Sequence, residues 1–332
     1  MLAHQLLSPP ETLGLLDKSI ETTIKQNADI TLASILLYHF RSGGKKIRAK
    51  LAIECMLLMG QTLENALTWG LCCELLHNAT LIHDDLQDED QMRRGQPTVW
   101  ARYGKHAAIT AGDFLIALPF KIIAQSHFTL QQKFILQQDL AQTSLNLANG
   151  QQKESFLKFC GANEIWNHYQ ECVKLKTGAL FELPVLGALH LLQFDFTWVE
   201  SIEKSCQNLG LIFQILDDYI DLFGNKGRGE IGSDIKEGKI SALIAFHIHN
   251  FPEFKNELLG YLNLPRSKTN HLHIEKIQSM LLEKATPLKL IQVINKLIGE
   301  LDRTKCQHEN CPILPFLIRL TKEYSHSMEI TL

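Results

Sequence analysis

Apolar residues recur at helical spacing along most of the chain. Long segments place apolar side chains at positions i, i+3, i+4 and i+7, which is typical of amphipathic helices. Alternating stretches of Val, Ile and Thr bounded by turns do not recur, so strand signals are nearly absent. The pattern predicts an all-α protein. It predicts helices over residues 11–40, 44–60, 62–90, 105–127, 130–155, 164–176, 178–192, 197–222 and 239–249, with several more beyond residue 270.

The organisation of the chain predicts one domain. No internal repeat or low-complexity segment interrupts the helical pattern. The 332 residues exceed the usual size of a domain, but large helical domains reach it. We therefore expect a single domain over residues 1–332, with a motif-bearing core over about 40–250 and peripheral helices over about 251–332.

Composition narrows the classes of function. The net charge of −3 gives no general electrostatic case for binding nucleic acid. The eight cysteines are mostly scattered, and with no signal peptide expected they predict reduced thiols in the cytoplasm. The spacing of Cys306 and Cys311 is loose for a metal site. No apolar run reaches the roughly 18 residues that span a bilayer; the nearest, 179–192, carries Glu182 and Pro184.

Two carboxylate clusters of the form Asp-Asp-x-x-Asp are the strongest chemical signal. Each follows an apolar run at helical spacing, and residues i and i+4 of a helix share a face. Like charges at that spacing repel, whereas Mg²⁺ binds carboxylates together with substrate phosphates. Facing each other across a cavity, the clusters would bind several metal ions and a diphosphate. Solvated acidic faces are the alternative. The clusters contain Asp84, Asp85 and Asp88, and Asp217, Asp218 and Asp221.

Basic residues near turns and helix starts supply candidates for binding the diphosphate. One group lies inside a predicted helix N-terminus, where backbone N–H groups and the helix dipole favour an anion. A second follows the first cluster, and arginine suits bidentate recognition of oxygen anions. A third closes a helix before Gly178. The groups are Lys45 and Arg48; Arg93 and Arg94; and Lys174, Lys176 and Thr177.

A glycine-rich loop over residues 224–238 directly follows the second cluster. It is too polar for the core, so we expect a mobile lid over the site. An ordinary connection between helices is the alternative.

The segments around both clusters resemble the aspartate-rich motifs of the trans-isoprenyl diphosphate synthases. Residues 77–88, followed by 93–98, resemble the first motif, and residues 213–221 resemble the second. Further family blocks occur in the family's order at residues 43–48, 111–114, 176–177 and 232–239. The resemblance implies an orthogonal helix bundle around a central apolar cavity. The first motif is most similar to that of enzymes making geranylgeranyl or longer products.

The resemblance also implies a reaction and a role for each residue. The reaction is the head-to-tail condensation of isopentenyl diphosphate with an allylic diphosphate, by a homodimer that uses three Mg²⁺ ions per site. Asp84, Asp88 and Asp217 would bind the metal ions, and Asp85, Asp218 and Asp221 would support them directly or through water. Arg93, Lys176, Thr177, Gln214 and Lys239 would contact the allylic substrate. Thr177 and Gln214 would also stabilise the allylic cation. Lys45, Arg48, His77 and Arg94 would hold isopentenyl diphosphate.

Product length is expected to depend on Ala79 and Thr80, one turn before Asp84. Both are small, whereas short-chain enzymes of the family often carry an aromatic residue there. We therefore expect geranylgeranyl diphosphate or a longer product.

The chain departs from the family pattern at a few positions. Glu230 stands where the family usually has lysine, with Arg228 nearby, and Ala49 stands where proline is common. The segment 241–243 replaces the family's Thr-Leu-Pro.

Two other functions compete with this interpretation. A class I terpene cyclase is also helical and Mg²⁺-dependent, but it would be expected to lack the second cluster and the block containing Lys45 and Arg48. A non-catalytic subunit of a heteromeric synthase would be expected to lose aspartates. This chain keeps both clusters and the basic block.

Overall fold

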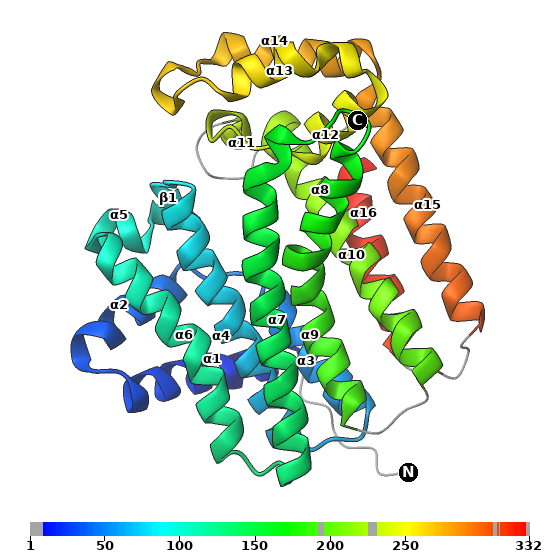
Figure 1. Ribbon diagram of the computed structural model, residues 1–332. Helices are drawn as coiled ribbons and strands as arrows, with labels where there is room; N and C mark the ends of the chain where they lie inside the picture. Colours follow the sequence, from blue (N-terminus) through cyan, green and yellow to red (C-terminus); the bar gives the residue numbers. More distant parts are fainter. Residues whose placement is uncertain (1–8, 192–195, 225–230, 308–310, 312, 330–332) are drawn as a thin grey trace. The chain divides into compact units, whose positions relative to one another are not determined.

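The computed structural model of the protein describes residues 9–191, 196–224, 231–307, 311 and 313–329 (Figure 1). The all-α prediction is confirmed. The elements in chain order are α1 (Pro9–Asn27), α2 (Ile30–Arg41), α3 (Ile47–Leu58), α4 (Leu63–Gln87), β1 (Met92–Arg93), β2 (Gln96–Pro97), α5 (Val99–Tyr103), α6 (Lys105–Gln125), α7 (Leu130–Phe156), η1 (Leu157–Phe159), α8 (Ile165–Val173), η2 (Lys174–Gly178), α9 (Ala179–His190), α10 (Phe196–Phe223), α11 (Ser233–Lys236), α12 (Ala242–Asn250), η3 (Pro252–Phe254), α13 (Lys255–Leu262), η4 (Arg266–Lys268), α14 (His271–Glu283), α15 (Thr286–Gln307) and α16 (Ile313–Glu329).

Helix boundaries differ from the prediction where side chains cap the backbone. The helix expected over 11–40 is two helices, because the Asp29 side chain accepts hydrogen bonds from Thr31 N (2.8 Å) and Leu32 N (3.1 Å) and starts α2. The helix expected over 62–90 ends at Gln87, with Asp88 as its C-cap. The last aspartate of the first cluster therefore lies at a helix end.

A short hairpin follows α4 and was not predicted. Met92 pairs with Pro97, and Arg93 pairs with Gln96. The turn residues Arg94 and Gly95 both have positive φ, 51° and 80°, as a two-residue hairpin turn requires. Two such short strands carry too little alternation to be visible in the sequence.

The chain divides into two compact units. Unit 1 contains Met1–Ala141 and Leu183–Gln193, and unit 2 contains Gln142–Glu182 and Phe194–Leu332. A single domain around a central apolar cavity therefore stays a prediction.

Unit 1 is built around α4, which packs against α3 on one side and α6 on another (Figure 1). Its core collects fully buried apolar side chains from α1, α2, α4 and α6. Among them are Leu16, Leu36, Leu75, Ala79, Ile82 and Leu115.

The helix α6 corrects the expectation that no segment is apolar enough to span a membrane. By its length and composition alone, this helix could cross a membrane. However, Ala108, Ala111, Leu115 and Leu118 of α6 lie in the core of unit 1. Packing against α4 therefore accounts for part of its apolar character.

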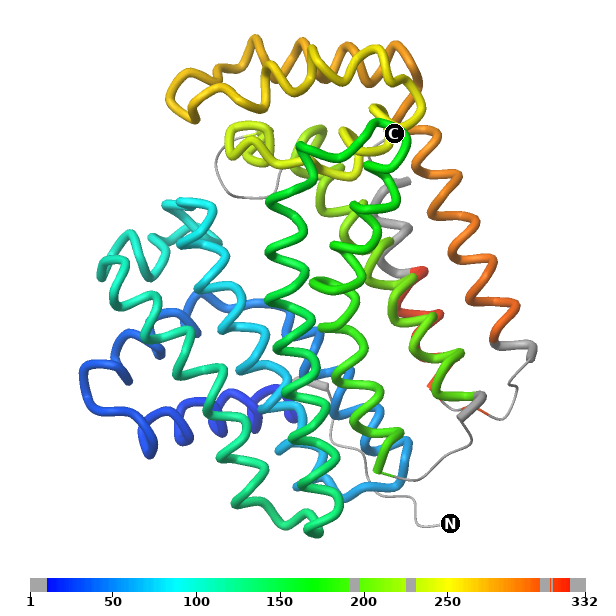
Figure 2. The backbone as a smooth tube through the Cα atoms, in the orientation of Figure 1, coloured from blue at the N-terminus to red at the C-terminus, as the bar shows by residue number. Residues whose placement is uncertain are grey.

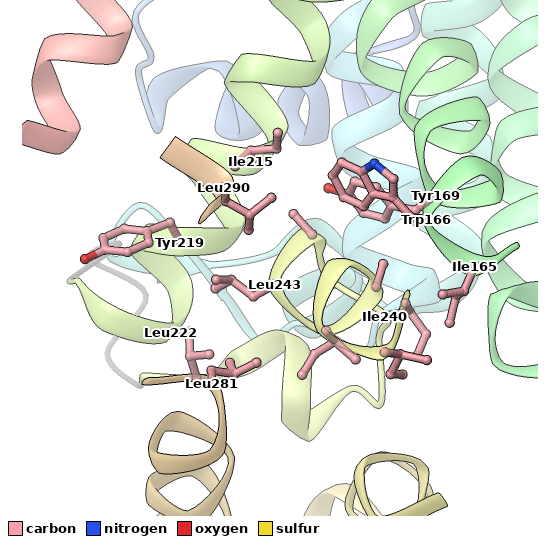
Figure 3. Packing of buried hydrophobic residues seen from close by; sticks show 14 of the residues in the cluster. Ile165, Trp166, Tyr169, Ile215, Tyr219, Leu222, Ile240, Leu243, Leu281 and Leu290 are labelled. Atoms are coloured by element: carbon pink, nitrogen blue, oxygen red, sulfur yellow. The ribbon is translucent and has the colours of Figure 1, made fainter. Parts of the chain in front are cut away.

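Unit 2 is organised by α10, a long continuous helix that the chain trace follows without a break (Figure 2). Its apolar side chains Ile212, Ile215 and Leu222 pack with residues of α8, α12, α14 and α15 (Figure 3). This core holds the second carboxylate cluster, because the cluster occupies the last two turns of the same helix.

Candidate active site

The first cluster lies at the C-terminal end of α4, and its middle residue is turned inward. Asp85 is 2% exposed, and its Oδ1 accepts hydrogen bonds from Arg93 Nε (2.7 Å) and Arg93 Nη2 (2.6 Å). Asp84 and Asp88 are half-buried. Arg93, expected to contact the allylic substrate, therefore has a structural partner that fixes the hairpin against α4.

The hairpin also contacts the loop before α3. Arg94 Nη1 donates to the carbonyl oxygen of Gly43, and Tyr38 Oη donates to that of Pro97 at 2.7 Å. Gly44 has a φ of +148°, and a Cβ there would lie 2.5 Å from Arg94 Nη1. The positive φ favours glycine, and any larger residue would have to displace the guanidinium from this loop. The contact brings Arg94 to the segment that carries Lys45.

The N-terminal turn of α3 holds the basic residues expected to bind isopentenyl diphosphate. Lys46 precedes the helix in the left-handed region, with φ of 49°, and forms an ion pair with Asp17. Lys45 is exposed and Arg48 is 8% exposed. Unit 1 thus combines an accessible cation and a buried one beside a helix N-terminus, where an anion is favoured.

His77 of α4 is uncharged at neutral pH. Burial lowers the pKa of His77 well below its usual value, and the nearby guanidinium groups of Arg48, Arg93 and Arg94 lower it further. Its Nδ1 is buried without a hydrogen-bond partner among the described residues. A neutral imidazole can still donate one hydrogen bond to a phosphate oxygen.

A buried polar network lies behind these residues. His39 Nε2 pairs with Asn78 Oδ1 at 3.0 Å, and Asn78 Nδ2 donates to Glu74 Oε1 at 3.1 Å. Burial raises the pKa of Glu74, although Asn78 and the charge of Arg48 oppose the shift. The network links α2 to α4 and places a carboxyl group near Arg48.

In unit 2, the middle aspartate of the second cluster accepts hydrogen bonds from its own helix and from two other helices, α8 and α12. Asp218 is 5% exposed. Its Oδ1 accepts from Gln214 Nε2 at 2.8 Å, and its Oδ2 accepts from Tyr169 Oη at 2.8 Å and Ala242 N at 2.6 Å. The carboxylate therefore sits at the N-terminus of α12, where the helix dipole favours negative charge.

The last aspartate of the cluster caps α11 in the same manner. Asp221 is 3% exposed and accepts hydrogen bonds from Ser233 Oγ and, at 3.1 Å, from Asp234 N. The backbone carbonyl of Asp221 also accepts from Gly232 N at 2.8 Å. Asp217, in contrast, is half-buried. Asp221 thus ties the last part of the glycine-rich loop to α10, and Asp218 ties the start of α12 to it.

The π-helical turn η2 carries the expected allylic-site residues Lys176 and Thr177. Lys176 Nζ donates to Glu154 Oε2 of α7 at 2.5 Å and to Gln151. The charges of Lys176 and Lys239 lower the pKa of Glu154 in spite of its burial. The half-buried carboxylate of Glu154 therefore holds Lys176, whereas Lys239 Nζ pairs with Glu237 Oε2 at 2.9 Å.

Glycines allow the close packing around η2. A Cβ on Gly150 would lie 2.7 Å from Lys176 Cγ, and one on Gly210 would lie 2.7 Å from Gly178 Cα. The turn therefore sits between two glycines, one from α7 and one from α10. Next to it, Thr177 Oγ1 donates to Gln214 Oε1 at 2.7 Å, so the two residues expected to stabilise the allylic cation are in contact.

The two expected product-length residues have different surroundings in unit 1. Ala79 is fully buried in the core. Thr80 is half-buried, and its Oγ1 donates to the carbonyl oxygen of His77 at 2.7 Å. Because residues i and i+4 share a face, Thr80 lies on the same face as Asp84 and Ala79 does not.

Some expectations lie outside the described residues. The expectations for Arg228, Glu230 and the rest of segment 225–230 of the expected lid are among them. The side chain of Cys306 also lies outside the described residues. Cys311 is buried and free. No group of three or more His, Cys, Asp or Glu side chains in the described part of the chain is placed to hold a metal ion. The expected ligands Asp84 and Asp88 belong to unit 1 and Asp217 to unit 2.

Four residues of these sites were not identified from the sequence. Glu154, Gln151 and Tyr169 lie far along the chain from their partners, and Glu74 lies within an apolar run. A charged or hydroxyl-bearing residue on an otherwise buried helical face is a weak signal, because such residues are more often surface residues. Of the four, Glu74 could most readily have been identified from the sequence, because a carboxylate in a buried run needs a partner.

Comparison with known proteins places these sites in a family. The polyprenyl synthetase family model matches residues 30–281. A short chain isoprenyl diphosphate synthase of Methanocaldococcus jannaschii is 31% identical over 266 residues, covering 78% of this chain and 80% of the relative. A geranylgeranyl pyrophosphate synthase of Geoglobus acetivorans is 32% identical, with 69% and 72% covered. The crystal structure of a geranylgeranyl pyrophosphate synthetase from Pyrococcus horikoshii shares the fold, with a TM-score of 0.82, 24% identity, and 95% and 96% covered.

Proposed function

The chain belongs to the polyprenyl synthetase family, and we propose that it is a Mg²⁺-dependent trans-prenyltransferase that condenses isopentenyl diphosphate with an allylic diphosphate. One observation carries the proposal. Each carboxylate cluster combines buried aspartates that are bonded to the protein with half-buried aspartates, Asp84, Asp88 and Asp217. Buried carboxylates fix the motif, and the half-buried ones are accessible to ligands that approach from outside.

The half-buried aspartates are the proposed Mg²⁺ ligands. Their carboxylate oxygens are the donor type that Mg²⁺ prefers, together with phosphate oxygens of a substrate. Bound Mg²⁺ would neutralise the leaving diphosphate as a Lewis acid. Three ions per site are part of the proposal. Asp85, Asp218 and Asp221 would act by holding their segments in place rather than by direct ligation.

Two sets of cations would bind the two diphosphates. Lys45, Arg48 and Arg94 of unit 1, beside neutral His77, would hold isopentenyl diphosphate. Lys176, positioned by Glu154, and Lys239, paired with Glu237, would hold the diphosphate of the allylic substrate from unit 2. Arg93 would contribute mainly by fixing the hairpin, because Asp85 occupies its Nε and Nη2.

The chemistry requires no protein nucleophile. The allylic C–O bond breaks, and its electron pair leaves with the diphosphate. The alkene of isopentenyl diphosphate attacks the allylic cation, which forms the new C–C bond, and a proton is then lost to the departed diphosphate. Thr177 and Gln214 would stabilise the cation with their oxygen dipoles, which are most effective where water is excluded.

The proposed product is geranylgeranyl diphosphate or a longer prenyl diphosphate. Thr80 lies one turn before Asp84 on the same face of α4 and is small. A helical turn rises about 5.4 Å, close to one isoprene unit, so an open turn there leaves room for about one more unit. Ala79 contributes by allowing α4 to pack closely within the core of unit 1.

We place the active protein in the cytoplasm as a homodimer. In unit 2, large apolar side chains in the second half of α7 and in η1 are exposed to solvent: Leu145 at 60%, Phe156 at 56% and Phe159 at 80%. Exposed apolar groups of this kind are typical of protein interfaces. Light scattering of wild type and Phe159→Glu would test the assembly. A wild-type monomer would reject the dimer.

Two other functions are less well supported. A class I terpene cyclase has no use for a second diphosphate site, yet unit 1 holds Lys45, Arg48 and Arg94 around the N-terminal turn of α3. A non-catalytic subunit has no reason to keep the bonded carboxylates of both clusters.

Separate substitution of the two cation sets tests the proposed function. Lys45→Ala should raise the KM for isopentenyl diphosphate by about tenfold and change the KM for the primer less, since one charge-assisted hydrogen bond is worth about 1.5 to 3 kcal/mol. Lys176→Ala should do the reverse. The exposed Lys50 of α3 is the control and should change neither. Equal effects of both substitutions on both substrates would refute the assignment.

A further inference from the structure

A chain of hydrogen bonds in unit 2 connects η2 to α8 through two residues of α10. Thr177 Oγ1 donates to Gln214 Oε1 at 2.7 Å, and Gln214 Nε2 donates to Asp218 Oδ1 at 2.8 Å. From the other side, Tyr169 Oη donates to Asp218 Oδ2 at 2.8 Å and Ala242 N donates to the same oxygen at 2.6 Å. Donors therefore converge on Asp218 from both sides.

The carboxylate of Asp218 determines which group donates in each of these hydrogen bonds. An ionised carboxylate only accepts hydrogen bonds, so Gln214 must turn its NH₂ group toward Asp218 and its carbonyl oxygen toward Thr177. That carbonyl oxygen also only accepts, so the hydroxyl of Thr177 must donate to it. The proton of Thr177 is thus directed to Gln214, and the lone pairs of its oxygen point elsewhere.

The acceptor at the centre is held rigidly. Tyr169 is 4% exposed, and its ring stacks on Trp166 with a centroid distance of 5.4 Å and an interplanar angle of 12° (Figure 3). Trp166 in turn meets Phe246 edge-on at 5.1 Å. The tyrosine hydroxyl therefore reaches Asp218 from a fixed position.

We propose that Tyr169, Asp218 and Gln214 are positioning residues that keep the oxygen lone pairs of Thr177 turned toward the allylic cation. The inference rests on the proposed function. When the allylic C–O bond breaks and its electron pair leaves with the diphosphate, positive charge develops on carbon. An oxygen that presents lone pairs lowers the energy of that charge, whereas a hydroxyl proton in the same place raises it. Dipoles fixed in advance are the most effective.

Binding of an unreactive cation measures this effect without turnover. The probe is a prenyl-type trialkylammonium compound with inorganic diphosphate and Mg²⁺, and its neutral hydrocarbon isostere is the reference. Tyr169→Phe keeps the ring and removes one donor to Asp218. It should weaken ammonium binding by about five- to tenfold, as expected for a buried hydrogen bond, and leave the neutral compound unchanged. Tyr219→Phe, a buried tyrosine of the same cluster, is the matched control and should change neither.

A double-mutant cycle separates the relay from a direct charge effect. Asp218→Asn also removes a negative charge, which would itself weaken ammonium binding. If Asp218 acts through Thr177, the loss caused by Asp218→Asn should shrink to less than about twofold in a Thr177→Val background. A loss that is the same in both backgrounds would overturn the relay.

Turnover of the same proteins separates failure of the relay from failure of the proposed function. The relay predicts that Tyr169→Phe lowers kcat by about five- to tenfold with little change in either KM. It also predicts that Asp218→Asn leaves the Mg²⁺ concentration for half-maximal activity unchanged. Normal wild-type turnover with an unaffected Tyr169→Phe variant would overturn the relay alone. Absence of wild-type turnover, with the ammonium pattern intact, would overturn the proposed reaction and support the relay as a cation-binding arrangement.

Discussion

Burial distinguishes the six aspartates from one another, although their spacing makes the two clusters look alike. Asp85, Asp218 and Asp221 are 2%, 5% and 3% exposed, and protein donors bond to each. A buried carboxylate without such donors would be very costly. The resemblance implied that these three support the metal ions, and the structure adds that they cap helices and hold an arginine.

This difference in burial predicts different defects for Asp217 and Asp221, which lie one helical turn apart in α10. Asp217→Ala should lower turnover by about two orders of magnitude or more, because a proposed metal ligand is lost, and should leave the melting temperature nearly unchanged. Asp221→Ala should lower the free energy of unfolding by about 1 to 3 kcal/mol, because Ser233 and Asp234 lose their acceptor. Thermal melts and rate assays on both variants check this. Near-normal turnover of Asp217→Ala in limiting Mg²⁺ would reject the metal role.

A second prediction at this scale concerns Glu182 of α9, which the proposed mechanism does not use. Burial raises the pKa of Glu182 to about 7; the charge of Glu203 adds to the shift, and Gln207 and Lys174 oppose it. An unfolded glutamate titrates near 4.3, so between about pH 4.3 and 7 the folded state binds more protons. Stability should therefore fall as pH rises through this window.

Glu182→Gln removes the buried charge. The variant should be more stable than wild type by about 1 to 3 kcal/mol at pH 8, and the difference should nearly vanish at pH 4. Urea unfolding at the two pH values measures it. A gain that is the same at both would show that the carboxyl of Glu182 is not the cause.

At the scale of elements, glycines determine how closely the site segments approach one another. Gly150 and Gly210 admit η2 between α7 and α10, and Gly44 admits the guanidinium of Arg94 against the loop before α3. The sequence indicated Gly43 and Gly44 as a break between helices. It could not indicate that the side chain meeting this loop comes from a hairpin about fifty residues later.

Gly44→Ala should therefore weaken one substrate site specifically. The new Cβ would lie within 2.5 Å of Arg94 Nη1 and would also disfavour the φ of +148°. Displacing Arg94 should raise the KM for isopentenyl diphosphate by about tenfold or more and leave the KM for the primer less affected. Gly60→Ala is the control, because Gly60 also has a positive φ, +75°, but its Cβ would meet nothing within 4 Å. A similar KM in both variants would mean that the contact does not position Arg94.

The helical pattern predicted α4, α6, α7 and α10 to within a few residues, because each pairs a long apolar face with a polar one. It missed the break at Asp29, because apolar spacing continues on both sides of that cap. It also missed the pairs Lys176–Glu154 and Tyr169–Asp218, which are 22 and 49 residues apart. Such contacts depend on tertiary packing, which spacing along the chain does not encode.

At the scale of the whole molecule, the order of the motifs along the chain predicted which segments carry the site residues. Both carboxylate clusters and the basic segments lie within residues 30–281, which match the polyprenyl synthetase family. The proposed reaction requires an apolar space for the growing prenyl chain. Thr80, which is half-buried, is the residue of the first motif that we propose lines that space.

Substitution at the two expected product-length residues should have different consequences. Thr80→Phe should shorten the products, because a ring on the face of Asp84 would occupy about one turn. Ala79→Phe was also expected to shorten them, but it adds a ring to a fully buried position and should lower stability by about 1 to 3 kcal/mol as well. Chromatography of the products and thermal melts compare the two. An unchanged product distribution for Thr80→Phe would place the length-determining wall elsewhere.

The central claim is that this chain condenses isopentenyl diphosphate with an allylic diphosphate. The most direct measurement is incubation of the purified protein with labelled isopentenyl diphosphate, Mg²⁺ and allylic primers of increasing length, followed by chromatography of the products. The account predicts labelled linear prenyl diphosphates of about twenty carbons or more, formed only when Mg²⁺ is present. Release of a cyclic hydrocarbon from the primer alone, or condensation only after a second protein is added, would contradict it.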